Sequence, residues 1–165
     1  MSIRRLFVTK RATFAQEANR VLQTIQKELS IPATSVTIYE RYDIDGLTDD
    51  HFETAKELIF SEPPIDIVSN NISIPEGALV VSRESIPGQY DQRSDSAEQC
   101  LAMLTLQSGA KVRTARIYVI TGTISEKEAD RIRKFYINPV DSRQASLAMP
   151  STLDLTIQPA APVPI

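Results

Sequence analysis

The sequence PGQYDQRSDSAEQC, residues 87–100, concentrates charged and hydrogen-bonding side chains in a few positions. A Pro-Gly turn comes first, and a helical pattern follows. We predict that Asp95 is the N-cap of this helix, that Glu98 completes a capping box, and that Arg93 pairs with Asp91 or Asp95. Capping needs only one or two such residues, and free amides at a helix N-terminus beside arginine and serine are typical of an anion site. A capped helix start and a ligand or partner contact therefore both remain open, and the candidate contact residues are Gln92, Arg93, Ser94 and Ser96.

Few other residues in the sequence suggest a catalytic, metal-binding or phosphate-binding site. One histidine, His51, and one cysteine are too few for a Cys/His metal set, and we expect His51 to be a solvent-facing residue in the first turn of a helix rather than part of a catalytic triad. The aspartates at 43, 45, 49 and 50 lack the ligand ladder and distal glutamate of a calcium loop, and a turn followed by a helix start explains them. None of the five glycines forms a phosphate-binding loop. We therefore predict no catalytic residue, no metal site and no cofactor in this chain.

The composition limits the classes of partner. A net charge of −3 argues against a protein that grips nucleic acid or an anionic membrane through bulk charge. No apolar run approaches the roughly 20 residues of a membrane span, and the N-terminus has no signal-peptide core. One cysteine, Cys100, excludes an internal disulfide and is expected to be a small buried hydrophobe of a helix. A cytoplasmic protein is the default expectation.

Hydrophobic periodicity predicts the elements that carry these residues. The first half reads as a strand over 3–9, a helix over 13–30, a strand over 35–42, a helix over 48–60 and a short strand over 65–69. Thr48 is the expected N-cap of the second helix.

The second half repeats this order. It reads as a strand over 78–84, a helix over 95–108 that ends at Gly109, a strand over 112–121 and a helix that ends near Ile137. Ser125 and Glu128 match a capping box for the last of these helices.

Corresponding residues of the two halves lie at a constant spacing. The offset along the chain from Gly46 to Gly122 equals the offset from Phe60 to Tyr136, and we call this common offset the repeat spacing. The predicted fold is therefore α/β, with two ferredoxin-like strand-helix-strand-helix lobes, about 3–68 and 78–143, in a pseudo-two-fold duplicated arrangement.

The character of the chain changes near Met149. The segment 149–165 holds four of the ten prolines and has no helical period. We predict one domain over 1–148, followed by an extended linker over 149–165 that leads to a further domain absent here.

The stretch 87–100, with SEPPID at 61–66 before it and YINPVDSRQAS at 136–146 after it, resembles the N-terminal domain of phosphoribosylformylglycinamidine synthase. The resemblance is to the large, single-chain form of that enzyme and runs from about residue 3 to 148. Ser94 stands where that family more often has alanine. In that family this domain resembles a dimer of the small S subunit of the split enzyme, which agrees with the repeat read from the spacing.

The resemblance implies a role in purine biosynthesis. The whole enzyme is a ligase that uses ATP and glutamine to convert formylglycinamide ribonucleotide (FGAR) into its amidine (FGAM). ATP and magnesium belong to a synthetase region, and a glutaminase region supplies ammonia. This chain would then be an inactive assembly domain that docks on the synthetase, bridges towards the glutaminase and contacts FGAR at its edge, with no nucleic acid and no membrane as partners. Arg93 would be the main anion contact, while Gln92, Ser94 and Ser96 would be weaker ones.

A second class of function fits the same predicted fold. A free-standing ferredoxin-like regulatory module could bind a small anionic metabolite between its lobes. A coding sequence that stops near Ile165 would favour such a module, and one that continues would favour the synthase.

Overall fold

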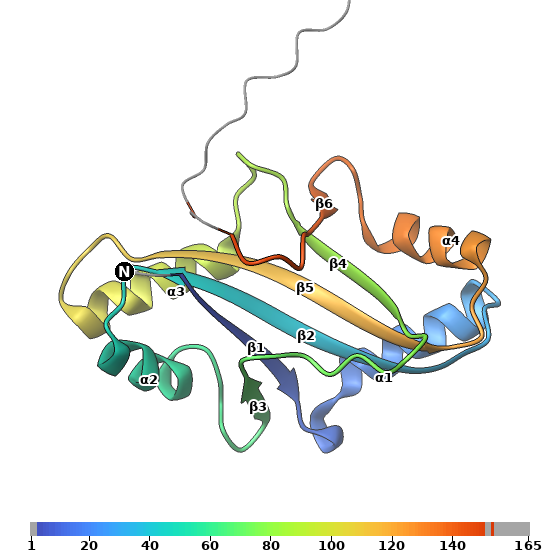
Figure 1. The fold of residues 1–165 in the computed structure, drawn as a ribbon, viewed down its shortest axis with the longest axis horizontal. Coiled ribbons are helices and arrows are strands. Elements are labelled where there is room, and N and C mark those ends of the chain that lie inside the picture. The colour runs from blue at the N-terminus through green and yellow to red at the C-terminus, as the bar shows by residue number, and fades with distance from the viewer. Residues whose placement is uncertain (1–2, 151–152, 154–165) are drawn as a thin grey trace, which may run out of the picture.

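The computed structural model describes residues 3–150 and 153, and it shows a mixed α/β fold built on one antiparallel sheet. The six strands lie in the order β3-β1-β2-β5-β4-β6 (Figure 1). The strands are β1 Arg4–Lys10, β2 Ala33–Asp45, β3 Asp66–Ser69, β4 Leu79–Ser85, β5 Lys111–Gly122 and β6 Ser142–Gln144. The helices are α1 Gln16–Gln23, α2 Asp49–Leu58, α3 Gln92–Thr105 and α4 Glu126–Tyr136.

All four helices pack on one face of the sheet. Alternate residues of the long central strands point to this face, because side chains alternate along a strand. Over one end of the sheet, α2 and α3 pack on a core that includes Leu6, Ile44 and Leu101. Over the other end, α1 and α4 pack on a core that includes Ile120 and Ile132. The middle of the helix-covered face is left to polar side chains, which form the candidate site described below.

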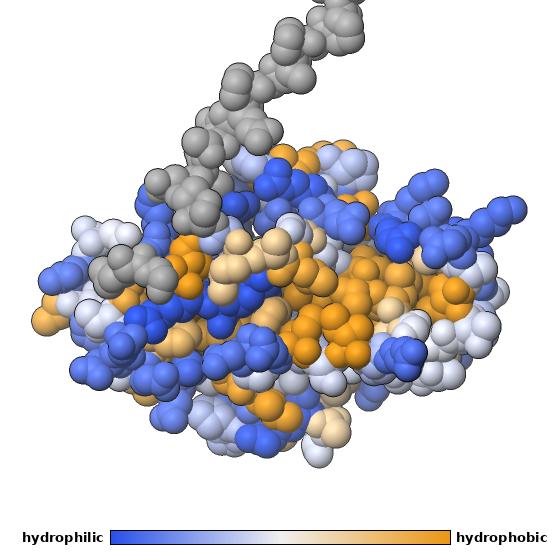
Figure 2. Space-filling view, in the orientation of Figure 1, coloured by the Kyte–Doolittle hydropathy of each residue, from blue (hydrophilic) through white to orange (hydrophobic). Residues whose placement is uncertain are grey.

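The opposite face of the sheet carries no helix and is crossed by two chain segments (Figure 1). The segment between β3 and β4 covers the buried side chains of Phe7, Ile117 and Val119, and Figure 2 shows an apolar area on this face. The hydrophilic half holds a buried ion pair, in which Arg5 contacts both carboxylate oxygens of Asp43 at 2.6 and 2.9 Å.

The segment that follows β6 crosses this hydrophilic half. The guanidinium of Arg41 donates to the carbonyl of Ser146 at 2.6 Å, and that of Arg5 donates to the carbonyl of Leu147 at 2.8 Å. Backbone carbonyls of residues far along the chain therefore accept from two buried guanidinium groups that also lie against the carboxylate of Asp43.

The predicted α/β class is confirmed, and the strands form one continuous sheet. Each half contributes three strands, and the halves join into one sheet through β2 and β5, which pair from Ala33 with Gly122 to Asp45 with Lys111. The strand β6 was not predicted, because three residues are too few to show an alternating pattern.

The helix ends were predicted with mixed success. Thr48 caps α2 by accepting from the amide of His51, and Ser125 forms the predicted capping box with Glu128. The helix predicted over 13–30 is divided into a 3₁₀ turn at 12–14, α1, and a π-helical turn at 24–28. Helix α3 starts at Gln92 rather than at Asp95, and Leu106 holds the left-handed position after it, ahead of the Gly109 that the sequence favoured.

Two further expectations concern the membrane and the C-terminal segment. None of the helices in the described part of the chain has the length and apolar character needed to cross a bilayer. The predicted linker over 149–165 lies outside the described residues, except for Met149, Pro150 and Leu153.

Candidate functional site

Asp91 is the N-cap of α3. One of its carboxylate oxygens accepts from the amide of Ser94 at 3.1 Å, and the other accepts from the hydroxyls of Ser94 and Thr114 at 2.8 and 2.7 Å. Burial by itself favours the protonated acid, but these hydrogen bonds outweigh it and lower the pKa of Asp91 below its ordinary value. A carboxylate of the chain thus occupies the helix N-terminus that the sequence suggested as an anion site.

The capping box predicted at Asp95 is wrong. Asp95 lies inside the first turn of α3, where its carboxylate accepts from the hydroxyl of Tyr90 and from the amide of Gln99, each at 3.0 Å. Glu98 reaches away from the helix start and accepts from the amide of Val112 on β5 at 3.0 Å. Glu98 therefore ties α3 to β5, Asp95 contacts residues about one turn away on either side, and neither acid caps the helix.

The four predicted contact residues do not act as one group. The hydroxyl of Ser94 is used in the cap. Gln92, Arg93 and Ser96 line a hollow on the helix-covered face of the sheet. Arg93 forms its ion pair with Glu40 of β2, not with Asp91 or Asp95 as predicted. Only Arg93 is therefore built into a charged network.

That network consists of four charged residues joined by three ion pairs at the centre of the sheet, and we call it the central quartet. Arg116 of β5 contacts Glu40 at 2.6 Å and Glu17 of α1 at 2.6 Å, while Arg93 pairs with the other oxygen of Glu40. Burial would lower the pKa of Arg116, but the adjacent carboxylate of Glu40 offsets it and raises this pKa above the ordinary value. The members are Glu17, Glu40, Arg93 and Arg116.

A third arginine lies beside the central quartet. Arg83 lies directly opposite Arg116 in the pairing of β4 with β5. Glu40 lies directly opposite Arg116 in the pairing of β2 with β5. The guanidinium of Arg83 donates to the carbonyl of Tyr136 at 2.9 Å and stands over the ring of Tyr118, 5.7 Å from its centre.

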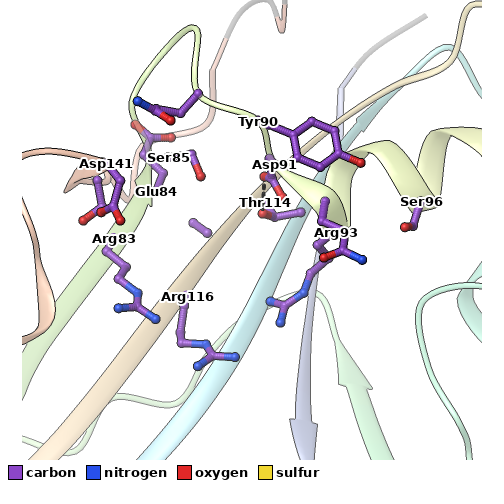
Figure 3. Close-up of a pocket in the computed structure, with 14 residues that line it drawn as sticks. Arg83, Glu84, Ser85, Tyr90, Asp91, Arg93, Ser96, Thr114, Arg116 and Asp141 are labelled. Carbon is purple, nitrogen blue, oxygen red and sulfur yellow. Dashed lines mark hydrogen bonds between the residues drawn. The ribbon is translucent and has the colours of Figure 1, made fainter.

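The three arginines line a hollow of about 780 Å³ between the start of α3 and the strands β4 and β5. Arg83 and Arg116 extend side by side from neighbouring strands, and Arg93 approaches from the first turn of α3 (Figure 3). The carboxylates of Glu84 and Asp141 lie towards the far end of β4 (Figure 3). The hollow is therefore polar and divided, with guanidinium groups at one end and acids at the other.

A second hollow of about 540 Å³ lies on the other side of the central quartet. It shares Arg93 and Arg116 with the first, but its remaining lining includes the apolar side chains of Val36, Ile38 and Phe60. The two hollows flank the central quartet and differ in polarity.

The other candidates of the sequence analysis carry no site. No group of three or more potential metal ligands occurs within the described ranges, 3–150 and 153. Cys100 is exposed, in contrast to the buried position predicted for it. Sequence reasoning missed Arg83 and Arg116, because each looks like an ordinary polar residue of an alternating strand. Only the pairing of β4 with β5 brings the two together.

Comparison with known proteins adds no relative to this geometry. No protein-family model and no curated protein matches the chain.

Proposed function

We propose that this chain is the N-terminal assembly domain of a single-chain phosphoribosylformylglycinamidine synthase and has no catalytic activity by itself. The motif PGQYDQRSDSAEQC and its two companion segments support the family, and a duplicated architecture supports the kind of domain. ATP and magnesium would bind in the synthetase region of the whole enzyme.

The inferred duplication is the point on which the proposal depends most. We infer that the halves are two ferredoxin-like units, each with the order strand-helix-strand-helix-strand, joined through β2 and β5. The strand order supports this inference, because β3, β1 and β2 follow one another from one edge to the centre of the sheet, just as β6, β4 and β5 do from the other edge. The helices of both halves also share one face of the sheet.

The register supports the same inference residue by residue. Leu6 pairs with Tyr42 in the first half, and Val81 pairs with Tyr118 in the second. Tyr42 packs on Phe60 with ring centres 4.7 Å apart, and Tyr118 packs on Tyr136 at 4.8 Å. Both members of the second ring pair follow those of the first by the repeat spacing found in the sequence.

The central quartet lies on the implied two-fold axis. Glu40 pairs directly with Arg116, its equivalent at the repeat spacing, so an axis that relates the halves must pass between them. Glu17 and Arg93 are related by the same spacing. Each acid of the first half is thus matched by a base of the second, and the two halves are complementary in charge. This pattern favours pairing between unlike halves over pairing between like ones.

The residues of the motif 87–100 that are not used in the cap of α3 are suited to a docking role. Gln92, Arg93 and Ser96 lie at the start of α3 beside the hollow, while Asp91 and Ser94 already satisfy the helix end. The side chain of Arg93 is about 40% exposed, and its guanidinium can donate to a second carboxylate or phosphate beside Glu40. We propose that this surface contacts the synthetase or the edge of its FGAR cleft.

Reconstitution tests the proposal. The chain and the synthetase and glutaminase regions of the same enzyme are produced as two polypeptides, mixed and analysed by sedimentation and by FGAM formation. We expect a complex, and FGAM formation that depends on the chain. Arg93→Ala should weaken the complex, whereas Arg133→Ala, an equal charge change on α4, should not. Two polypeptides that never associate would rule out the assembly role.

The alternative, a free-standing module that binds a small anionic metabolite, is favoured by one observation. The polar hollow of about 780 Å³ has the size of a small-molecule site. A coding sequence that ends near codon 165 would favour this function over the synthase.

A further inference from the structure

Arg83 is a cation without a carboxylate partner among the residues that the structure describes. Its contacts are the carbonyl of Tyr136, 2.9 Å from Nη1, and the face of the Tyr118 ring. By contrast, Arg93, Arg113, Arg116 and Arg143, which lie near it, each pair with at least one glutamate. A guanidinium carries five donors, so most of those of Arg83 are left for another partner.

The position of Arg83 makes this isolation costly. It lies directly opposite Arg116 in the β4–β5 register, and like charges in such positions destabilise a sheet. Glu40 and Glu17 already engage Arg116, so their charges balance that cation and Arg93 rather than Arg83. In the first half, β1 pairs with β2 on the side away from β5, and the β1 residue opposite Glu40 is Val8, an apolar residue. The second half thus carries an extra cation that neither the fold nor the repeat requires.

Arg83 is also held in a fixed orientation. The ring of Tyr118 supports one face of its guanidinium, and the Tyr136 carbonyl fixes one edge. A planar fork that is ordered in advance loses little entropy when it binds an oxyanion with two parallel hydrogen bonds. This arrangement is typical of a recognition site for phosphate or carboxylate.

The acids that line the same hollow are at its other end or are already neutralised. Glu84 pairs with Arg143 at 3.0 Å and with Arg113 at 3.4 Å, and Asp91 is engaged by Thr114 and Ser94. Asp141 is exposed beside Ser142 at the acidic end. Hydroxyl or amine donors of a ligand would find acceptors there, while an oxyanion would be repelled.

We propose that the 780 Å³ hollow binds a small polar molecule with an oxyanion group, phosphate or carboxylate, on Arg83 and with hydroxyl or amine donors towards Asp141. The site does not require that the chain be part of a synthase. It differs from the docking surface proposed above, because it depends on Arg83 of β4 and not on the outward side of Arg93.

Calorimetric titration at low ionic strength tests the site on the chain as it is. The probes are inorganic phosphate, ribose 5-phosphate and succinate, which separate a phosphate site from a carboxylate site. We expect ribose 5-phosphate or succinate to bind, and Arg83→Met to weaken that binding by at least about tenfold, because charge-assisted hydrogen bonds are lost. The control Arg133→Met removes the same charge from α4, where Arg133 pairs with Asp130 at 2.8 Å, and should leave binding unchanged.

A second variant keeps the test decisive if Arg83→Met does not fold. Arg83→Lys retains the charge and the aliphatic stem but loses the fork, and it should bind with intermediate affinity. The proposal is overturned if no probe binds the wild-type chain, if Arg83→Lys binds like wild type, or if Arg83→Met and Arg133→Met weaken binding equally. Ribose 5-phosphate that binds no more tightly than phosphate would contradict the role of Asp141. These titrations do not involve a synthetase, so they can fail while the assembly role stands.

Discussion

The side chain of Asp91 accepts hydrogen bonds both from its own helix and from a distant strand. It caps α3 through Ser94, and it accepts from Thr114 on a strand 23 residues later. The local task satisfies the helix start, and the long-range one ties that start to a different element. The hydrogen bonds of Asp91 therefore fix the start of α3 against β5.

The first prediction concerns this residue. Asp91→Ala should lower the free energy of unfolding by about 1–2 kcal/mol, since it removes an N-cap and leaves the hydroxyl of Thr114 without its acceptor. Asp95→Ala is the matched control, because it removes an aspartate one turn later that caps nothing. Urea unfolding at pH 7 measures both. A larger loss for Asp95→Ala would contradict the assignment of the cap.

The pKa of Asp91 gives a second prediction, on pH dependence. Because this pKa is lower in the folded chain than the ordinary 3.8, ionised Asp91 stabilises the fold above that value. The contribution is lost as the pH falls through the lowered pKa. The stability difference between wild type and Asp91→Asn should therefore shrink below about pH 3.8, which unfolding curves at several pH values can follow. A difference that stays constant down to pH 2 would mean that the pKa is not lowered by folding.

At the scale of elements, the start of α3 shows what local patterns can and cannot predict. Asp95 with Glu98 matches a capping box as well as Ser125 with Glu128 does, yet only the second pair forms one. Thr114 decides between Asp91 and Asp95, and it reaches the helix only once β5 is in the sheet. Helix and strand positions follow from periodicity, whereas the choice between two adjacent caps depends on a contact that no local pattern contains.

The end of the same helix gives a third prediction. Leu106 holds a left-handed conformation, φ 58°, with its side chain 89% exposed. Leu106→Gly should raise the free energy of unfolding by about 0.5–1 kcal/mol, because glycine avoids the steric cost of that conformation and little packing is lost. Met103→Gly, at an exposed position inside α3, should lower it by a similar amount. Thermal unfolding of both variants measures the two effects, and a loss of stability in both would contradict the geometry at Leu106.

At the scale of the whole molecule, the constant spacing was visible in the sequence, but the ion pairs between its positions were not. The repeat spacing predicted equivalent elements, and it also relates Tyr42 and Phe60 to Tyr118 and Tyr136. The central quartet could not be found in the same way, because its positions at the repeat spacing carry opposite charges. A search for residues of the same type at the repeat spacing does not find such pairs.

The quartet gives a fourth prediction. Arg116→Glu should lower the free energy of unfolding by about 2 kcal/mol, since it leaves three acids and one base in a partly buried cluster. Inverting all four residues, with Glu17→Arg, Glu40→Arg, Arg93→Glu and Arg116→Glu, restores the alternation of charge and should recover most of that loss. Chemical unfolding of the single and quadruple variants measures the recovery. A quadruple variant no more stable than the single one would mean that the quartet does not act as a complementary set.

A fifth prediction follows from the proposed division of labour. The chain by itself should neither release ammonia from glutamine nor hydrolyse ATP, because those activities would belong to the glutaminase and synthetase regions. The measurement is an ammonia and phosphate assay on protein from two independent purifications. Reproducible turnover in both would contradict an inactive assembly domain.

The most direct test of the assembly role is to read the coding sequence beyond codon 165 and to assay its whole product. We predict that the reading frame continues into synthetase and glutaminase regions and that the product forms FGAM from FGAR, glutamine and ATP. A stop codon directly after Ile165, or a longer product that cannot amidate FGAR, would contradict the account.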